Sequence, residues 1–363
     1  MNSNNYCIIM AGGTGTRFWP LSTKSRPKQF LDILGTGKSL LQMTFERFIK
    51  VCPVSNIFVV TNEIYNELVR SQLPELEQNQ VLLEPAKKNT APCIAYANYK
   101  IQAVNPKANI VVSPADHLIL DEEDFLKIIK EGLAFTAQND ALLTLGIQPS
   151  RAETGYGYIQ INRDEEVEDN ENIYKVKTFT EKPNKELAQK FYESGEFFWN
   201  SGIFLWSLQS IQSAFKSYLS DIDDLFAAGT DKYNTPEEAD FISEVYFKCK
   251  SISIDYGIME KADKVYVYVS KFGWADLGTW GSLQEHLSND ENNNAIKGEN
   301  VLTYDVKNSV INFDDDKLVV IKGLDNYIVV ESENKLLIYK KKDEQEIKEI
   351  VAKIENKKGS EYI

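Results

Sequence analysis

A glycine-rich loop close to the start of the chain contains the residues best suited to chemistry. The apolar run Cys7–Ala11 leads directly into Gly12–Gly15, which reads GGTG. Because glycine has no side chain and adopts positive φ angles, such a loop can bring several backbone N–H groups close to anionic oxygens. Arg17 and Lys28 follow and add two positive charges. The pattern predicts a loop that binds phosphate groups.

Two common phosphate-binding motifs do not fit this stretch. A Walker A motif that ends at Gly37-Lys38-Ser39 would need a glycine where the chain has Asp32. A dinucleotide-binding Gly-x-Gly-x-x-Gly motif that starts at Gly13 would need a glycine where the chain has Phe18. The loop is therefore of another nucleotide-binding type, or it is a turn that only reverses the chain.

Strand and helix patterns alternate after the loop. The expected strands are 7–11, 56–60, 80–85 and 109–113, and the expected helices between them are 39–51, 62–73 and 90–103. Short apolar strands separated by helices are typical of parallel sheets that are covered on both faces. We predict an α/β fold with a Rossmann-like, mixed but mostly parallel sheet flanked by helices.

The ends of these strands carry the next candidate residues. Ligands of such sheets bind beyond the carboxyl ends of the strands. The glycine-rich loop follows the first strand, Glu84 and Pro85 end the third, and Asp116 follows the fourth, so we expect them to meet at one edge. Asp116 can hold Mg²⁺ there or cap the next helix. Asp276, which precedes another short helix, leaves the same two alternatives open.

A polar stretch divides the chain into two expected domains. Residues 287–298 (LSNDENNNAIKG) are rich in asparagine and show no apolar period. We therefore predict a catalytic domain at residues 1–288. Short β-like runs at near-regular spacing follow, and an amphipathic helix closes the chain. They predict a small β-rich domain with a terminal helix at residues 299–363.

Composition excludes several classes of protein. The formal net charge of −14 argues against binding to nucleic acid, whose phosphates are held by lysine and arginine. The four cysteines lack metal-binding spacing and lie mostly among apolar residues, so we expect reduced thiols. No signal-like segment opens the chain, and no apolar run approaches about 18 residues. We expect a soluble cytoplasmic protein that does not enter a membrane.

The loop and three later motifs resemble one known family. MAGGTGTRFWPLSTKSRPKQFLDI, from Met10 to Ile33, is similar to the signature loop of the sugar-1-phosphate nucleotidylyltransferases. Its FWPLS variant resembles the mannose-1-phosphate guanylyltransferase branch of that family. GYGY at 155–158, TEKP at 180–183 and WNSGIF at 199–204 resemble the sugar-phosphate side of the same family. The order of these motifs strengthens the resemblance.

The resemblance implies a role for each candidate residue. Arg17 would stabilise the departing pyrophosphate, Lys28 the α-phosphate, and Asp116 and Asp276 would hold Mg²⁺ as the cofactor. The implied nucleotide-binding residues are Gly12, Gly13, Thr14, Gly15, Arg17, Lys28, Glu84, Pro85, Asn89, Thr90 and Asp116, and the implied sugar-phosphate-binding residues are Gly157, Glu181, Lys182 and Asn200. Glu84 can pair with the N1–H and amine of guanine, or it can only brace the loop. Glu181 and Lys182 can also form a simple surface ion pair.

The implied reaction transfers GMP from GTP to mannose 1-phosphate and gives GDP-mannose and pyrophosphate. The attacking phosphate oxygen is ionised at neutral pH, so no serine, cysteine or histidine base is needed. Two alternatives stay open: a nucleotidylyltransferase for another nucleotide or hexose 1-phosphate, and a noncatalytic regulatory paralogue that binds nucleotide-sugar. We also expect a homodimer, a short left-handed β-helix in the C-terminal domain, and a single activity, because the sequence ends without the isomerase domain of some longer members.

Overall fold

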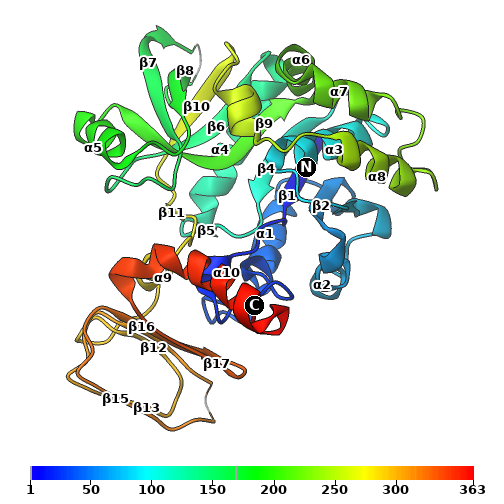
Figure 1. Ribbon diagram of the computed structural model, residues 1–363. Helices are drawn as coiled ribbons and strands as arrows, with labels where there is room; N and C mark the ends of the chain where they lie inside the picture. Colours follow the sequence, from blue (N-terminus) through cyan, green and yellow to red (C-terminus); the bar gives the residue numbers. More distant parts are fainter. Residues whose placement is uncertain (1, 168–169, 315) are drawn as a thin grey trace. The chain divides into compact units, whose positions relative to one another are not determined.

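The computed structural model describes residues 2–167, 170–314 and 316–363, which form two compact units (Figure 1). The first unit comprises Met1–Gly12, Gln42–Ala115 and Ile119–Trp274, and the second comprises Gly13–Leu41, Asp116–Leu118 and Ala275–Ile363. Both units are discontinuous in sequence, and the second contains the glycine-rich loop as well as the C-terminal part. The predicted domains 1–288 and 299–363 therefore stay a proposal.

Within the described residues of the first unit, nine strands form one mixed sheet. Their order is β3-β2-β1-β4-β9-β6-β10-β8-β7. The strands are β1 (Asn5–Met10), β2 (Ile57–Asn62), β3 (Val81–Glu84), β4 (Asn109–Pro114), β6 (Leu142–Ile147), β7 (Tyr158–Glu166), β8 (Ile173–Thr180), β9 (Phe197–Ser207) and β10 (Val265–Ser270).

The directions of these strands confirm a mixed sheet. β1 to β4 pair in parallel, as their short apolar runs predict, and β6 and β10 form another parallel pair. β9 runs antiparallel to both β4 and β6, and β7 and β8 are antiparallel neighbours. The parallel share of the sheet is therefore smaller than the sequence predicts, because β9 enters between two strands that run the other way.

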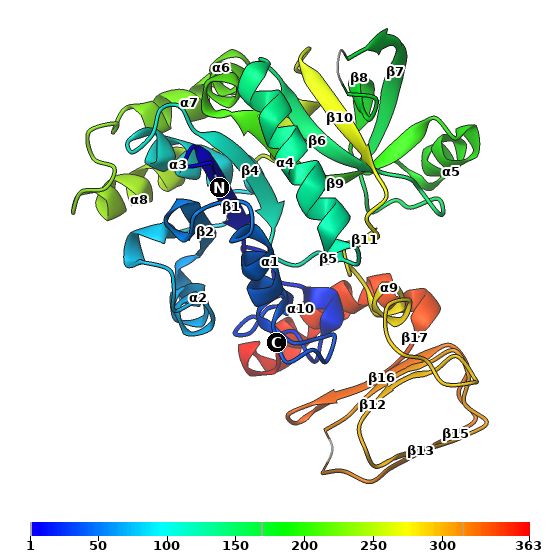
Figure 2. The same cartoon turned by 180° about the vertical axis from the view of Figure 1, so that it is seen from behind.

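Helices cover both faces of this sheet. They are α2 (Asn66–Gln72), α3 (Thr90–Gln102), α4 (Glu122–Gln138), α5 (Lys185–Ser194), α6 (Leu208–Tyr218), α7 (Ser220–Ala227) and α8 (Glu238–Lys248), while α1 (Leu40–Phe48) begins in the second unit and continues in the first. Successive side chains of a strand face opposite sides. Trp206 of β9 belongs to the core that includes α3 and α6, whereas Leu205 approaches Gly132 of α4. α4 lies across that second face (Figure 2).

The register of the parallel strands brings their carboxyl ends to one edge. Met10 pairs with Val60 of β2 and with Pro114 of β4, and Asn62 pairs with Glu84 of β3. The four strands β3, β2, β1 and β4 therefore end along one edge of the sheet, as predicted. Gly12 and Ala115 lie at this edge, and the chain continues from each of them into the second unit.

The second unit contains the β-rich C-terminal part. Its elements are α9 (Trp280–Gln284), β12 (Ala295–Lys297), β13 (Val301–Tyr304), β14 (Val310–Asn312), β15 (Val319–Lys322), β16 (Tyr327–Ser332), β17 (Lys335–Lys340) and α10 (Ile347–Lys358), and β5 (Leu118–Ile119) and β11 (Trp274–Ala275) lie where the chain passes between units. β12, β14 and β16 stack in parallel, and so do β13 and β15. Successive coils of chain therefore lie on one another around a small core of Val306, Ile311, Phe313 and Val329.

The polar stretch expected to link the domains is ordered. β12 begins inside it, and Asn294 is buried. The side-chain amide of Asn294 donates to the carbonyl oxygen of Val306 at 2.9 Å and accepts from the N–H of Ser309 at 3.0 Å. Asn294 thus makes hydrogen bonds to backbone groups of the next coil. The asparagine-rich stretch is therefore part of the β-rich structure and not a linker.

In the part of the chain that the structure describes, no helix combines the length and the apolar character needed to cross a membrane.

Candidate active site

The glycine-rich loop has a conformation that depends on Gly15. This residue has a φ of 56°, in the left-handed region that favours glycine. A Cβ atom at Gly15 would lie 2.5 Å from the Cβ of Lys28 and 3.0 Å from the hydroxyl oxygen of Ser22. A side chain at this position would therefore be strained by the backbone and would also collide with the neighbouring segment.

Side chains hold the carbonyl groups of the loop. The amide of Gln29 donates to the carbonyl oxygen of Gly13 at 2.9 Å, and the hydroxyl of Ser22 donates to that of Thr14 at 3.0 Å. In a trans peptide the following N–H points in the opposite direction from the carbonyl. The N–H groups of Thr14 and Gly15 therefore point away from these two side chains, and neither donates to another described residue. Both can receive an anionic oxygen.

Lys28 connects the two aspartates that the sequence singled out. Its side chain is buried, and its ammonium lies 2.8 Å from a carboxylate oxygen of Asp116. The same ammonium donates to the backbone carbonyl oxygens of Asp276 at 2.8 Å and of Leu277 at 3.0 Å. An ammonium has three N–H donors, so Lys28 uses all of them within the protein. It therefore acts first as a clamp that brings both aspartates to one place.

The charge of Asp116 is set by opposing effects. Burial disfavours the ionised carboxylate, but the charge of Lys28, the charge of His117 and the hydrogen bond from Lys28 outweigh it. The pKa of Asp116 consequently lies below its ordinary value. His117, the residue that directly follows Asp116, thus contributes to the electrostatics of the site.

The backbone around Asp276 is strained. Leu277 is fully buried and has a φ of 46°, which is rare for a residue with a Cβ atom. A carboxylate oxygen of Asp276 accepts a hydrogen bond from the N–H of Gly278 at 3.0 Å. Such strain persists only where surrounding contacts hold it, and the bonds from Lys28 and Gly278 are contacts of that kind.

A pocket of about 310 Å³ lies at this place in the second unit. Its lining residues are Thr14, Gly15, Thr16, Arg17, Phe18, Lys28, Asp116, His117, Asp276, Gly278 and Lys348. The Nε atom of Arg17 is buried and finds no hydrogen-bond partner among the described residues. A buried N–H donor without an acceptor costs free energy unless a ligand completes it. The pocket therefore combines amides, cations and two carboxylates, which suits a polyphosphate.

The pocket also fits a divalent metal ion. No cluster of three or more histidine, cysteine, aspartate or glutamate side chains that could bind a metal occurs in the described residues. Two carboxylates, Asp116 and Asp276, line the pocket. Mg²⁺ is commonly held by one or two carboxylates and completes its shell with phosphate oxygens and water. Asp116 and Asp276 therefore fit the coordination preference of Mg²⁺.

A second group of predicted residues lies together in the first unit. The N–H of Asn200 donates to the carbonyl oxygen of Gly157 at 2.8 Å, and the side-chain oxygen of Asn200 accepts from the hydroxyl of Thr144 at 2.9 Å. A Cβ atom at Gly157 would lie 2.5 Å from a carboxylate oxygen of Glu181. Glu181 forms an ion pair with Lys182, whose side chain is 59% exposed. Gly157, Glu181 and Asn200 thus form one polar cluster.

Asp255 belongs to this cluster although it is not among the sugar-phosphate-binding residues that the family resemblance implies. It lies in the π-helical turn Asp255–Met259, and its carboxylate accepts from the amide of Asn200 at 2.9 Å. Burial and the nearby charge of Glu181 raise its pKa to about 7. Turns of this type often occur at functional sites, but a single turn of five residues is too short to show a helical period in the sequence.

Glu84 lies at the edge of the first unit's sheet and is almost fully enclosed. One carboxylate oxygen accepts from the hydroxyl of Tyr246 at 2.9 Å, and the other would lie 3.5 Å from a Cβ atom at Gly12. Burial raises the pKa of Glu84 to about 7, although Tyr246 and Lys87 oppose that rise. These contacts favour a structural role for Glu84, in which it braces the loop, over a direct pairing with guanine.

Pro85, Asn89 and Thr90 follow Glu84 on the way to α3. Asn89 caps α3 and is exposed, while the hydroxyl of Thr90 accepts from the N–H of Ile254 at 2.8 Å. Thr90 is therefore fixed to the residue that precedes Asp255. Of these residues, Asn89 is the one whose side chain remains most accessible to a ligand.

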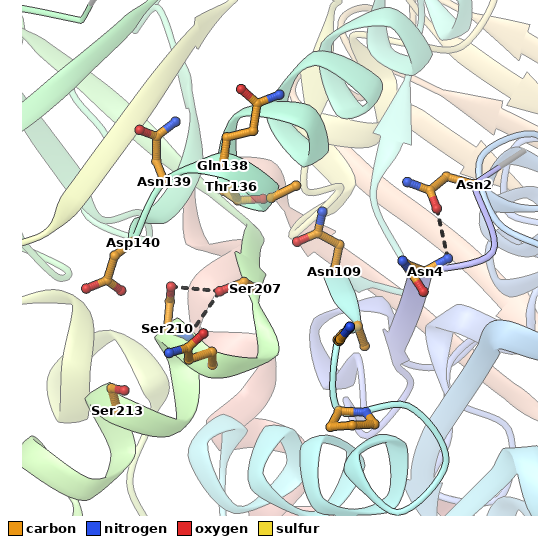
Figure 3. A pocket seen from close by; sticks show the side chains of 15 residues that line it. Asn2, Asn4, Asn109, Thr136, Gln138, Asn139, Asp140, Ser207, Ser210 and Ser213 are labelled. Atoms are coloured by element: carbon orange, nitrogen blue, oxygen red, sulfur yellow. Dashed lines mark hydrogen bonds between the residues drawn. The ribbon is translucent and has the colours of Figure 1, made fainter.

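Another cavity of about 490 Å³ lies in the first unit (Figure 3). Amides and hydroxyls line it, among them Asn109, Ser207 and Ser210. Many of these groups bond to neighbours: the hydroxyls of Ser207 and Ser210 lie 2.8 Å apart, and the amide of Asn109 donates to the carbonyl oxygen of Leu133 at 2.9 Å. No group of cations converges among the described residues of this cavity, so it lacks the character of the pocket around Arg17.

An α/β fold with an amide-lined pocket, cations and paired carboxylates defines a class of protein that handles nucleotide phosphates. The chain belongs to the nucleotidyl transferase family, whose model matches residues 6–293. The mannose-1-phosphate guanylyltransferase of Salmonella montevideo is 38% identical over 98% of this chain and 75% of that protein. Mannose-1-phosphate guanylyltransferase 2 of Escherichia coli O157:H7 is 35% identical over 98% of this chain and 74% of that protein.

A solved structure is similar over nearly the whole chain. The crystal structure of a protein described as mannose-1-phosphate geranyltransferase, from Thermus thermophilus, has 29% identity and a TM-score of 0.86. It covers 97% of this chain and 99% of its own. The family resemblance predicted from the loop and the three later motifs is therefore confirmed.

Proposed function

We propose that this chain transfers GMP from GTP to mannose 1-phosphate, forming GDP-mannose and releasing pyrophosphate. The observation that carries the proposal is the pocket in which the glycine-rich loop, Arg17, Lys28 and two aspartates line one space. Relatives named mannose-1-phosphate guanylyltransferase, similar over nearly the full chain, support this choice of substrates.

The reaction needs alignment rather than a protein base. A phosphate oxygen of mannose 1-phosphate forms a bond to the α-phosphorus of GTP. The bond from that phosphorus to the oxygen that bridges to the β-phosphate breaks, and pyrophosphate leaves with the electron pair. Because the attacking oxygen is already ionised, the protein has to hold two anions in line and reduce their repulsion.

The second unit supplies the groups for the triphosphate. The N–H groups of Thr14 and Gly15 would receive phosphate oxygens, and Arg17 would stabilise the departing pyrophosphate, which would satisfy its buried Nε atom. Bound Mg²⁺, held by Asp116 and Asp276, would neutralise phosphate charge. Lys28 lies beside Asp116 and so adds positive charge near the α-phosphate while it clamps both aspartates.

The polar cluster of the first unit would bind the sugar phosphate. Sugar hydroxyls both donate and accept, so a carboxylate and an amide such as Glu181 and Asn200 suit them. Asp255, which the structure adds to this cluster, would offer a further oxygen to a hydroxyl. The exposed ammonium of Lys182 would neutralise the phosphate. Because Gly157 has no Cβ atom, the carboxylate of Glu181 can lie next to its backbone.

The base-binding residues belong to the proposal as well. Glu84, Pro85, Asn89 and Thr90 lie on one continuous segment from the end of β3 to the start of α3, and Asn89 is exposed there. We assign Asn89 the direct contact with guanine. Glu84, whose carboxylate is bonded to Tyr246, supports the loop at Gly12.

Four further features complete the proposal. We assign Mg²⁺ as cofactor, a cytoplasmic location, a homodimer, and a left-handed winding of the coils from β12 to β17. All four cysteines are buried free thiols, which suits a reducing compartment. Exposed apolar side chains on β13 and β15, including Leu302 and Val320, suit contact with a second copy.

The test is pyrophosphate release with Mg²⁺ present. Each of the four nucleoside triphosphates is combined with mannose 1-phosphate and with glucose 1-phosphate. We expect GTP with mannose 1-phosphate to give the highest kcat/KM. A different best pair would assign another nucleotidylyltransferase activity. No release with any pair would contradict the proposal and favour a noncatalytic paralogue that binds nucleotide-sugar.

A further inference from the structure

The last helix of the chain contributes a side chain to the triphosphate pocket. Lys348 lies in the first turn of α10 and lines the same pocket as Thr16, Arg17 and Asp276. Its side chain is exposed, and it makes no hydrogen bond or ion pair with any residue that the structure describes. A cation that lines a pocket without an acidic partner is available to an anionic ligand.

Several contacts fix α10 at this position. The indole N–H of Trp19, which follows the glycine-rich loop, donates to the carbonyl oxygen of Tyr362 at 2.7 Å. Lys24 forms an ion pair with Glu355 of α10. Ile347 is fully buried directly before Lys348. The C-terminal end of α10 and the turn after it are thus attached to the segment that follows the glycine-rich loop, and the first turn of the helix is held by the buried Ile347.

The segment before α10 is attached to the metal-binding side of the pocket. Glu344 accepts a hydrogen bond from the N–H of Gly281, at the start of α9, with a distance of 2.8 Å. α9 follows Asp276 by only a few residues, and the ring of Trp280 contacts that of Phe18 at 5.0 Å between centroids. The C-terminal segment therefore contacts both sides of the pocket that Lys348 lines.

The other cations of the pocket leave a role for Lys348. Lys28 uses its three donors within the protein, so it cannot give a full set of bonds to a phosphate without releasing an aspartate or a carbonyl group. Arg17 has one buried unsatisfied donor. A leaving pyrophosphate carries several negative charges, and the chain as a whole carries −14, so these charges need local cations.

We propose that Lys348 binds the β- and γ-phosphates of the nucleotide and the pyrophosphate that leaves, so that the C-terminal helix forms part of the triphosphate site. The inference rests on the proposed function for the identity of the substrate, but not for the chemistry of the ligand, which is a linear polyphosphate. The amphipathic pattern near the end of the sequence predicts a helix there, but no local pattern connects position 348 with position 17.

The experiment measures binding of inorganic tripolyphosphate by calorimetry at fixed ionic strength, together with the KM for GTP and for pyrophosphate in the reverse direction. Lys348→Ala should weaken tripolyphosphate binding and raise both KM values by about tenfold, because one charge-assisted contact is lost. Lys348→Arg should restore most of the affinity. Lys353→Ala is the matched control, since Lys353 is exposed on the same helix and does not line the pocket.

Two binding results and one unfolding result would overturn the inference. The first binding result is unchanged tripolyphosphate affinity in Lys348→Ala, and the second is an equal loss in Lys353→Ala, which would indicate a general charge effect. Thermal unfolding should give the same Tm for all variants, and a lowered Tm in Lys348→Ala alone would assign the lysine a structural role instead. Failure of the wild type to release pyrophosphate would contradict the proposed function, while the tripolyphosphate comparison would still decide the role of Lys348.

Discussion

Asp276 is positioned mainly by bonds to its backbone and its neighbours. Its carbonyl oxygen and that of the strained Leu277 both accept from Lys28, and the N–H of Gly278 donates to its carboxylate. One side-chain oxygen is thus used to shape the turn, while the negative charge of the carboxylate can serve a metal ion. An amide in its place would keep the shape and lose the charge.

Asp276→Asn should therefore lower the activity without lowering the stability of the fold. The asparagine oxygen can still accept from Gly278, so we expect a Tm close to that of the wild type. Loss of the carboxylate should lower kcat by at least about 100-fold, because the phosphates lose a charge-neutralising partner. The measurement is pyrophosphate release under saturating GTP and mannose 1-phosphate. Activity near that of the wild type would remove Asp276 from the mechanism.

Asp255 makes the stability of the protein depend on pH. Its pKa is about 7 in the folded state, against an ordinary value near 3.8, since burial and the charge of Glu181 raise it while Asn200 and Lys182 oppose that rise. Between these values the folded state keeps a proton that the unfolded state has released. The contribution of this group to stability therefore falls as pH rises from about 4 to 7.

Asp255→Asn should remove that fall. At pH 5 both side chains are neutral in the folded state, but the unfolded wild type has already released its proton, so the difference in urea midpoint between the two proteins should be smaller than at pH 8. At pH 8 the variant should be more stable by about 2 kcal/mol, a value reduced from the full shift to allow for partial exposure. Urea unfolding of both proteins at the two pH values gives the double difference. Equal pH dependence in the two proteins would contradict the assignment.

The residue types of both sites could be predicted from sequence, but their pairings could not. Strand ends and motif resemblance indicate Arg17, Lys28, Asp116 and Asp276, and all four line one pocket. Lys28 donates to the carbonyl oxygens of Asp276 and Leu277, which lie more than two hundred positions later in the sequence. No local sequence pattern predicts contacts over such a separation.

The glycine-rich loop is the element on which the proposed triphosphate site depends, and its glycines are not equivalent. Gly15 has positive φ and no room for a Cβ atom, whereas a Cβ atom at Gly13 would meet nothing within 4 Å. We expect Gly15→Ala to lower the free energy of unfolding by about 2–4 kcal/mol. Gly13→Ala, the matched control, should unfold like the wild type. Urea unfolding checks both, and equal stability of the two variants would contradict this account of the loop.

Elements were predicted best where apolar periods were long. The strand expected at 109–113 is β4, and the helix expected at 90–103 is α3, which ends one residue earlier. β12 was missed because its three residues lie in an asparagine-rich stretch. The antiparallel entry of β9 was also missed, since the direction of a strand depends on its partners and not on its own pattern.

At the scale of the whole molecule, the cations of the pocket favour a phosphate ligand, whereas the exposed apolar side chains of the β-rich part favour a protein partner. The net charge of −14 leaves phosphate binding to a few local cations, as the pocket lined by Arg17, Lys28 and Lys348 illustrates. On the β-rich part, by contrast, Leu302 of β13 and Val320 of β15 lie opposite each other and are 48% and 60% exposed. Apolar neighbours exposed on one sheet favour contact with another protein surface.

We expect this sheet to join two copies of the chain. Light scattering after gel filtration should give a mass near twice 41.3 kDa for the wild type. The double variant Leu302→Lys with Val320→Lys should elute as a monomer, because four lysines would face one another across a symmetric interface. Phe247→Lys is the control, since Phe247 is 87% exposed on α8 in the other unit and should leave the dimer intact. A monomeric wild type, or a double variant that remains dimeric, would contradict the proposed interface.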